Sequence, residues 1–169
     1  ELLKGNIQIS DLIHMYHQSK GRQTEEEFKV IEKFYQESTK KQIQAAIEFN
    51  FGKDDENDLK KAILLTSKNS TMYIHRTTMF ATTMGTLAAV SYIIGGADNS
   101  PRGILINKTT GEATYAKYGV TASSQPVPFR LTRMIERSFG PCGLKGPYTT
   151  SFRKTVKGIK KYTDALGMC

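Results

Sequence analysis

The segment Y-I-I-G-G-A-D-N-S-P-R-G-I-L-I (Tyr92–Ile106) decides how the rest of this chain is interpreted. It leads from a long uncharged stretch, through a polar loop that contains glycine, into a short β-branched run. Three segments follow it in order: the turn N-K-T-T-G (Asn107–Gly111), the run E-A-T-Y-A-K-Y-G (Glu112–Gly119) and the motif P-V-P-F-R-L-T-R-M (Pro126–Met134). This order predicts a helix, a loop, a pair of strands and a second helix.

The residues on either side of the loop predict a long helix followed by a β-hairpin. Thr77–Ile94 contains no charged side chain, and it is expected to form a buried central helix. The stretch Thr77–Ala97 is long enough to cross a bilayer, but its six hydroxyl side chains and three glycines favour burial in a protein core. Strands are expected at Ile104–Ile106 and Ala113–Ala116, joined by a turn that ends in Gly111.

Shorter helices are expected on both sides of this unit. Ser10 is expected to cap a helix whose apolar residues Leu12, Ile13 and Tyr16 share one face. Apolar residues at helical spacing predict five further helices, at Phe28–Tyr35, Ile43–Ile47, Leu59–Leu65, Leu131–Phe139 and Phe152–Tyr162. The last of these helices has a lysine-rich opposite face. The predicted fold class is therefore mainly α (α+β).

The composition is that of a soluble globular domain with an uneven charge. The 169 residues, 38% of them hydrophobic and 24% charged, are expected to form one domain. Residues 1–85 hold 12 basic and 12 acidic side chains, whereas residues 86–169 hold 12 basic and 4 acidic, so the second half carries the whole net charge of +8. This basic half is expected to be a solvated face that meets acidic neighbours in a longer chain, with an acidic partner protein or nucleic acid as the alternatives. Nucleic acid is less favoured, because no recognised nucleic-acid motif accompanies the charge.

The cysteines and the ends of the chain exclude some classes of protein. Cys142 and Cys169 have no metal-ligand spacing, so neither a disulfide framework nor a zinc site is expected. No charged-then-apolar leader opens the chain, so secretion is not expected. The chain begins and ends without tails, as expected for a fragment of a much longer protein.

The order and spacing of these segments resemble the C-terminal lobe of the phosphatidylinositol-3-kinase-related kinases, a family of very large Ser/Thr kinases that includes TOR. The resemblance covers nearly the whole chain. Its most specific motif is P-F-R-L-T, formed by Pro128, Phe129, Arg130, Leu131 and Thr132. Asp58–Thr78 resembles the TOR-type segment before the central helix, and Gly143–Tyr148 resembles the family's following turn. The resemblance implies that residues 1–169 form one kinase C-lobe with a long buried central helix and one small β-hairpin.

The positions that hold magnesium in active family members do not carry metal ligands here. In those members the loop after the central helix has the pattern G-D-R-H-x-x-N, whose Asp orients the substrate hydroxyl and whose Asn binds metal. The resemblance places the vestigial positions of this loop and of the D-F-G motif on Asp98, Asn99, Ser100, Gly103, Lys117 and Gly119. Only the first Asp is retained: Gly103 replaces the metal-binding Asn, and Lys117 replaces the Asp of D-F-G.

The change at Lys117 is large on an electrostatic scale. One unit-charge pair separated by about 4 Å is worth about 4 kcal/mol at an effective dielectric constant of about 20. Replacing a carboxylate by an ammonium beside a divalent ion is therefore expected to cost on the order of 10 kcal/mol before screening, enough to empty a magnesium site. Two alternatives stay open for Lys117: a salt bridge across the vacated cleft, or a contact to a nucleotide phosphate without metal.

Other candidate residues have simpler interpretations. Asp98 is expected to cap a turn or to pair with Arg102, with a residual role as catalytic base as the alternative. His75 is expected to be a packing or capping residue. His14 and His17 have no partners at metal-ligand spacing, so no metal site is expected there.

The resemblance finally gives a set of functional expectations. No glycine-rich phosphate loop and no V-A-I-K-type lysine occurs, so the nucleotide-binding N-lobe is expected to lie outside this chain, as is the C-terminal FATC tail. The lost D-F-G aspartate, a short segment after it and P-V-P-F-R-L-T resemble the TRRAP-type pseudokinases. This branch implies a nuclear scaffold in SAGA-type histone acetyltransferase complexes, bound to protein subunits, with no membrane, no metal and no cofactor. The alternatives are a divergent, cytoplasmic TOR-like Ser/Thr kinase using ATP and Mg²⁺, and a basic helical module that binds nucleic acid.

Overall fold

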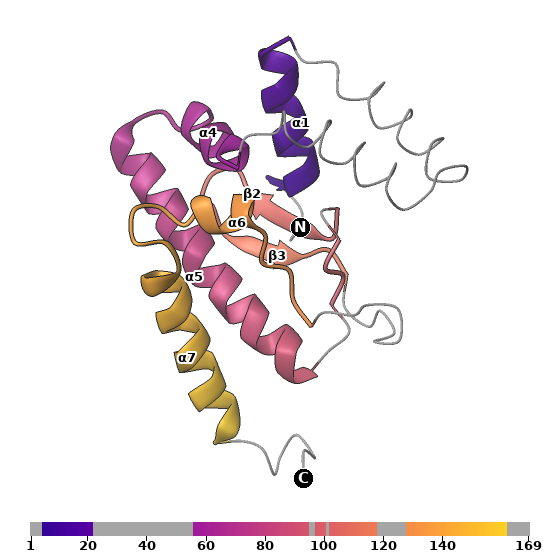
Figure 1. Ribbon diagram of the computed structural model, residues 1–169, viewed down its shortest axis with the longest axis vertical. Helices are drawn as coiled ribbons and strands as arrows, with labels where there is room; N and C mark the ends of the chain where they lie inside the picture. The colour runs from indigo at the N-terminus through magenta and orange to yellow at the C-terminus, as the bar shows by residue number, and fades with distance from the viewer. Residues whose placement is uncertain (1–4, 22–55, 95–96, 101, 118–127, 162–169) are drawn as a thin grey trace, which may run out of the picture.

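The computed structural model describes residues 5–21, 56–94, 97–100, 102–117 and 128–161. Helices surround one long central helix, α5, and a small antiparallel sheet lies beside it (Figure 1). The elements in chain order are β1 (Asn6–Gln8), α1 (Ile9–Ser19), α4 (Asp58–Leu65), α5 (Ser70–Ile94), β2 (Ile104–Asn107), β3 (Ala113–Tyr115), α6 (Arg133–Arg137), the 3₁₀ turn η2 (Gly143–Lys145) and α7 (Pro147–Lys160). The predicted fold class, mainly helical with a small sheet, is confirmed.

Helix α5 is longer than the sequence predicts. It begins at Ser70 rather than Thr77, because the Asn69 side chain accepts a hydrogen bond from the Met72 amide at 2.7 Å and caps the helix there. Residues 66–69 therefore separate α4 from α5. Phe80 is fully buried on α5, and the threonine hydroxyls of the helix donate to carbonyl oxygens one turn earlier, as Thr83 does to Met79 at 2.8 Å. This pairing lets a hydroxyl-rich helix lie in the core.

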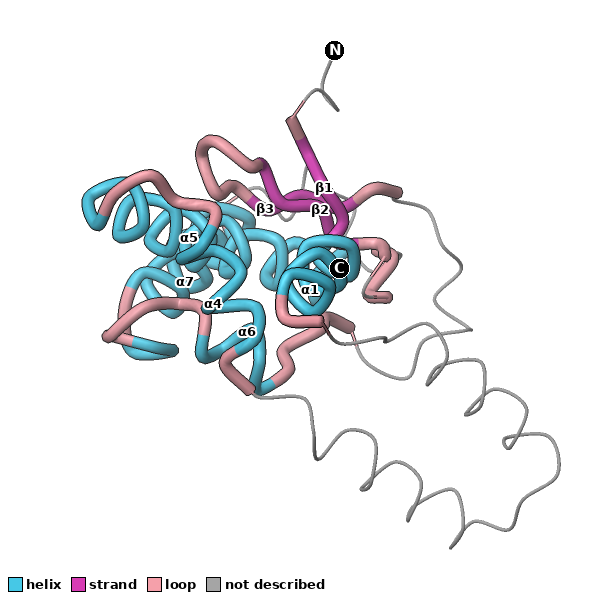
Figure 2. The backbone as a smooth tube through the Cα atoms, turned by 90° about the horizontal axis from the view of Figure 1, so that it is seen from above, coloured by secondary structure: helices cyan, strands magenta, loops and turns pink. Residues whose placement is uncertain are grey.

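The sheet has three strands, one more than the predicted hairpin. β2 lies in the centre and pairs antiparallel with both β1 and β3, with Ile7 opposite Ile106 and Leu105 opposite Thr114. Viewed from above, the sheet lies to one side of the helices (Figure 2). The predicted strand positions are confirmed to within one residue at each end. β1 was not predicted, because three residues are too few to show an alternating pattern.

The hairpin turn depends on Asn107 and Gly111. The Asn107 side-chain oxygen accepts hydrogen bonds from the amides of Thr109 and Thr110, at 2.9 and 3.0 Å. Gly111 has a φ of +81°, and a Cβ atom there would lie 2.7 Å from the Cα atom of Arg76. The predicted glycine at the end of the turn is thus required twice, by its backbone conformation and by its contact with α5.

Helices α1 and α4 pack against each other at one end of α5 (Figure 1). α1 begins at Ile9, so Ser10 lies inside the helix instead of capping it, and its hydroxyl donates to the Gln8 side chain at 3.4 Å. The predicted apolar face is confirmed, since Leu12 is buried and Tyr16 packs partly buried against the core. The helices predicted at Phe28–Tyr35 and Ile43–Ile47 lie outside the described residues.

Of the last two helices, α7 packs along α5, whereas α6 packs mainly against α4. α6 spans Arg133–Arg137 and is shorter than the predicted Leu131–Phe139, because the Thr132 hydroxyl accepts a hydrogen bond from the Ile135 amide and caps the helix at its start. α7 is the element with the most extensive contact to α5. Its apolar side begins earlier in the sequence than predicted, at Tyr148 instead of Phe152. Tyr162, the predicted last residue, lies outside the described residues.

Candidate functional site

The structure brings the predicted loop and the end of β3 together. The Asp98 amide donates to the Lys117 carbonyl oxygen at 3.4 Å, and the Ala116 amide donates to the Gly103 carbonyl oxygen at 2.8 Å. Three of the vestigial positions, Asp98, Gly103 and Lys117, therefore lie side by side, as the family resemblance implies. Gly119 lies outside the described residues.

Asp98 caps a turn within its own loop. Its Oδ1 atom accepts a hydrogen bond from the Ser100 amide at 3.0 Å. Ser100 in turn accepts two hydrogen bonds from the Gly103 amide, one through its carbonyl oxygen and one through its hydroxyl, each at 3.0 Å. Among the described residues, no ion pair joins Asp98 to Arg102. Of the two structural roles expected for Asp98, the structure therefore has the turn cap.

Gly103 leaves no room for a side chain. A Cβ atom at this position would overlap the Asp98 carbonyl oxygen and would lie 2.7 Å from Asp98 Oδ1. The space beside Gly103, the position that the resemblance aligns with a metal-binding asparagine, is thus filled by the Asp98 carboxylate and backbone. In this loop conformation, an asparagine at residue 103 cannot be accommodated unless Asp98 moves.

Lys117 contributes its backbone to this junction, while its side chain is exposed to solvent. No ion pair of Lys117 is present within the part of the chain that the structure describes, so the expected salt bridge across the cleft does not form with these residues. Nor do the described residues contain a group of three or more His, Cys, Asp or Glu side chains that could hold a metal ion. The described part of the site thus presents a turn carboxylate and an exposed ammonium.

Asn99 is a structural residue of the site. It is buried, and its side-chain oxygen accepts a hydrogen bond from the Tyr115 hydroxyl at 3.1 Å. The Asn99 carbonyl oxygen also accepts a hydrogen bond from Arg130 Nη1 at 3.5 Å. The residue that replaces the family's arginine therefore links the loop to β3 and to the P-F-R-L-T motif.

The P-F-R-L-T motif fastens the chain to the helices around it. The Ser91 hydroxyl of α5 donates to the Pro128 carbonyl oxygen, and the Phe129 ring lies 6.4 Å from the Phe152 ring of α7. Thr132 caps α6, whereas Leu131 is 37% exposed. These contacts give the motif a structural role, which its sequence alone does not reveal.

His75 differs from expectation, and His17 has a partner that was not predicted. His75 is exposed, so the prediction that it is a packing residue is wrong. Among the described residues, no capping hydrogen bond of the His75 side chain is present either. His17 is buried on α1 and shares a 2.8 Å hydrogen bond between its Nε2 atom and Asp58 Oδ2 on α4. Sequence reasoning missed this pair, although a carboxylate at the start of an apolar helix was the available signal.

No described helix is long and apolar enough to cross a membrane. Helix α5 has the length to span a bilayer, but it carries polar side chains that form hydrogen bonds within the protein. Thr86, for example, shares a hydrogen bond with Ser151 of α7 at 2.7 Å.

The chain is similar to Ser/Thr kinases of the phosphatidylinositol-3-kinase-related family. It is 24% identical over 169 residues to "Serine/threonine-protein kinase mTor" of Drosophila melanogaster, covering 94% of this chain and 7% of that protein. It is 24% identical over 118 residues to "Serine/threonine-protein kinase TOR" of Oryza sativa subsp. japonica, covering 65% of this chain and 5% of the relative. "Serine/threonine-protein kinase ATM" of Drosophila melanogaster is 26% identical over 102 residues, which cover 56% of this chain and 4% of the relative.

No family model matches the chain. The similarity supports a kinase region of this family at low identity, and the chain spans less than a tenth of the length of each of these relatives. The helical fold with its small sheet is consistent with a fragment resembling the C-lobe of such a kinase.

Proposed function

We propose that this chain is a kinase C-lobe that does not transfer phosphate and that serves as a protein-binding scaffold. The proposal rests on the absence of metal ligands at the two positions that the resemblance aligns with the magnesium-binding residues of active family members. Gly103 offers no side-chain oxygen, and a side chain at this position would overlap Asp98. Lys117 offers a cation where a carboxylate is needed.

The retained fold supports a role in binding. The loop, β3 and the P-F-R-L-T motif are held together by hydrogen bonds of Asp98, Asn99 and Arg130 that need no metal. A lobe that keeps its architecture while losing its ligands can still present surfaces to partner proteins. On this proposal the protein requires neither ATP nor Mg²⁺.

Within this proposal the scaffold is of the TRRAP type. The resemblance of Lys117-Tyr118-Gly119 and of the following P-V-P-F-R-L-T to that branch supports a nuclear protein bound to the subunits of a SAGA-type histone acetyltransferase complex. Purification of the tagged full chain from nuclear extract, followed by a histone acetyltransferase assay, tests this part. Recovery of the protein without acetyltransferase activity would contradict the assignment to such a complex.

Loss of phosphoryl transfer is tested on the full protein with radiolabelled ATP. We expect no transfer, and no change in melting temperature when ATP and Mg²⁺ are added. Lys117→Asp should introduce a Mg²⁺-dependent stabilisation by ATP, because a carboxylate returns to the cleft. Lys108→Asp, the same change at an exposed residue of the hairpin turn, is the matched control and should introduce none. Phosphate transfer that Asp98→Ala abolishes would overturn the proposal.

A divergent TOR-like Ser/Thr kinase is the second candidate. Two observations favour it: the similarity to TOR proteins from a plant and an insect, and the retention of Asp98 at the position of the catalytic base. This candidate predicts ATP-dependent transfer to a Ser/Thr peptide in the same assay, and loss of that transfer in Asp98→Ala.

A further inference from the structure

One side of helix α7 is fixed firmly against the core. Tyr148 is buried, and its ring stacks on the Phe139 ring at a centroid distance of 4.8 Å. Gly85 of α5 brings the two backbones together, since a Cβ atom there would lie 3.1 Å from the Tyr148 carbonyl carbon and 3.2 Å from the Phe152 amide nitrogen. This packing sets the rotation of α7 about its axis, so the opposite side of the helix must face away from α5.

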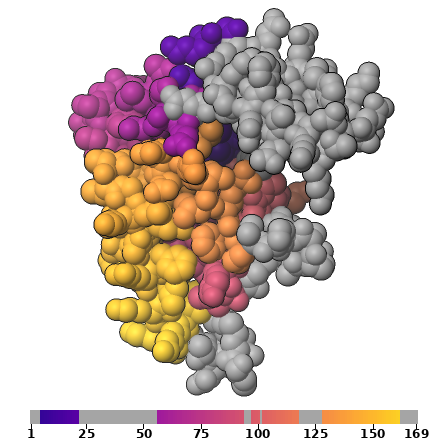
Figure 3. Space-filling model, viewed as in Figure 1, coloured from indigo at the N-terminus to yellow at the C-terminus, as the bar shows by residue number. Residues whose placement is uncertain are grey.

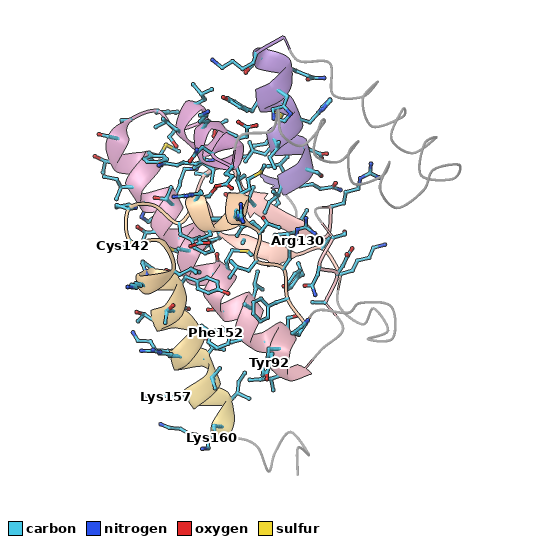
Figure 4. All side chains as sticks on the ribbon, in the orientation of Figure 1. Tyr92, Arg130, Cys142, Phe152, Lys157 and Lys160 are labelled. Carbon is cyan, nitrogen blue, oxygen red and sulfur yellow. The ribbon has the colours of Figure 1, made fainter. Side chains whose placement is uncertain are left out.

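That opposite side is basic and exposed. Arg153, Lys154, Lys157 and Lys161 all have exposed side chains. Arg153, Lys157 and Lys161 are spaced by four residues, so they follow one another along the helix at intervals of about 6 Å. Figure 4 shows Lys157 on the outer side of α7 and Phe152 on the side toward α5, and α7 forms an outer edge of the molecule in Figure 3. We call these four residues the basic face.

The basic face is not neutralised by its own helix or by the helix beneath it. Neither α5 (Ser70–Ile94) nor α7 (Pro147–Lys160) contains an Asp or a Glu. Within the described part of the chain, no ion pair involves Arg153, Lys154 or Lys157. Like charges one helical turn apart repel each other, so this arrangement lowers the stability of α7 slightly in isolation. An anionic partner would remove that repulsion.

The chemistry around the basic face indicates which anion it fits. A membrane-binding helix carries its apolar side chains toward the lipid, but Tyr148 and Phe152 of α7 are packed into the core. Surfaces for single-stranded nucleic acid place aromatic rings among the cations, whereas the rings of α7, Tyr148 and Phe152, lie on the core side. Carboxylates repeated every four residues on a partner helix would match the spacing of Arg153, Lys157 and Lys161.

We propose that the basic face of α7 is a docking surface for an acidic helical segment of a partner protein. This inference deepens the proposed scaffold function by naming the surface and the chemistry of its partner, and it rests on that function. The contact is electrostatic, so we expect it to speed association and to select against basic partners. Its contribution to affinity is expected to be smaller.

The test measures binding of the full chain to a fluorescein-labelled helical peptide with glutamate at every fourth position, with the glutamine version as the control peptide. The variant Arg153→Glu/Lys157→Glu/Lys161→Glu should bind the glutamate peptide at least about 10-fold more weakly at low salt. The matched control, Lys60→Glu/Lys68→Glu/Lys108→Glu, makes the same change in net charge at exposed lysines outside α7 and should lose less than about 2-fold.

Three outcomes would overturn the inference: no binding of the glutamate peptide, equal losses in the two triple variants, or tighter α7-dependent binding to a DNA duplex or to phosphatidylserine vesicles. Thermal melting of both variants excludes unfolding as the cause of any loss. Gly85→Ala, which disturbs the seating of α7 without changing charge, is a second variant and should also weaken peptide binding. Phosphate transfer by the wild-type protein would contradict the proposed inactivity and leave this test unaffected.

Discussion

The first turns and the middle of helix α5 are held by opposite kinds of chemistry. At its first turns, the buried Arg76 donates from Nη1 to the Thr66 and Ser67 hydroxyls at the end of α4, at 3.0 and 2.9 Å, and its Nε atom has no hydrogen-bond partner. Further along, Gly85 meets the α7 backbone directly, and aromatic rings fill the space around it. We call these the polar junction and the apolar junction.

The difference lies in what each junction tolerates. Burial lowers the pKa of Arg76 because its charged form loses hydration. A second buried polar contact, the His17–Asp58 pair, joins α1 to the start of α4. A buried polar group is stable only while its partners are in place, so this side is specific in geometry and sensitive to the loss of one atom. The apolar junction is stabilised by close packing and does not depend on any one hydrogen bond. It leaves no room for added atoms.

The largest effect is expected for Asp58→Ala, in the second buried polar contact. Removing the carboxylate leaves His17 buried beside a gap, and the free energy of unfolding should fall by about 3–5 kcal/mol. Asp11→Ala is the matched control, because Asp11 is also in the first turn of a helix but is exposed; it should cost less than about 1 kcal/mol. Urea denaturation measures both values. Equal losses in the two variants would contradict the expectation that a buried polar contact is sensitive to the loss of one partner.

A double-mutant cycle sharpens this result. If the His17–Asp58 hydrogen bond is the main contribution, the losses for His17→Ala and Asp58→Ala should not add, and their coupling energy should exceed about 1 kcal/mol. Additive losses would mean that the two residues stabilise the protein through separate neighbours.

The next largest effect is expected for Gly85→Ala in the apolar junction. The added methyl group would overlap the Tyr148 carbonyl oxygen, which belongs to backbone and cannot rotate away, so α7 must shift. The free energy of unfolding should fall by about 1–3 kcal/mol, although alanine is the better helix former. Guanidinium denaturation measures the change, and a stabilised variant would show that α7 does not pack as closely as described.

A smaller effect is expected from the titration of Tyr148. Burial, and then the charge of nearby Tyr115, raises the pKa of Tyr148 from 10.0 to about 12. Because the folded-state pKa is the higher one, this contribution to stability is complete below pH 10 and is lost as the pH rises toward about 12. The difference in unfolding free energy between wild type and Tyr148→Phe should therefore shrink across that range, by at most about 2 kcal/mol. A difference that does not change with pH would contradict the assignment.

The smallest effect is expected for Gly158→Ala on α7. Nothing lies within 4 Å of a Cβ atom at Gly158, so the substitution adds helix propensity without a clash. The free energy of unfolding should rise by about 0.5–1 kcal/mol. This variant has the same chemistry as Gly85→Ala, so opposite signs for the two would show that contact with α5, and no general property of glycine, decides the outcome.

The local features of the fold were predictable from the sequence. The uncharged stretch before Ala97 predicted α5, and short runs around Gly111 predicted the hairpin, because both patterns arise within a few neighbouring residues. The early start of α5 was missed, since Asn69 becomes a cap only once the chain after α4 has turned. β1 was missed because its pairing joins residues that are a hundred positions apart, as Asn6 and Asn107 are.

The candidate site was predictable in its residue types and not in its contacts. The replacement of metal ligands at Gly103 and Lys117 follows from the family resemblance alone. The use of Asn99 as a buried link to Tyr115 does not follow from it, since nothing in the sequence shows that this loop residue is buried.

The sequence by itself determined which atoms are available: a glycine and a lysine at two ligand positions, and an excess of basic residues in the second half of the chain. Only the tertiary structure decided where these atoms act. It placed Asp98 against Gly103 so that no side chain fits there, and it turned the basic face of α7 away from α5. The physical reason is that charge and chemical type belong to single residues, whereas available space and exposure depend on packing between segments that are distant in the chain.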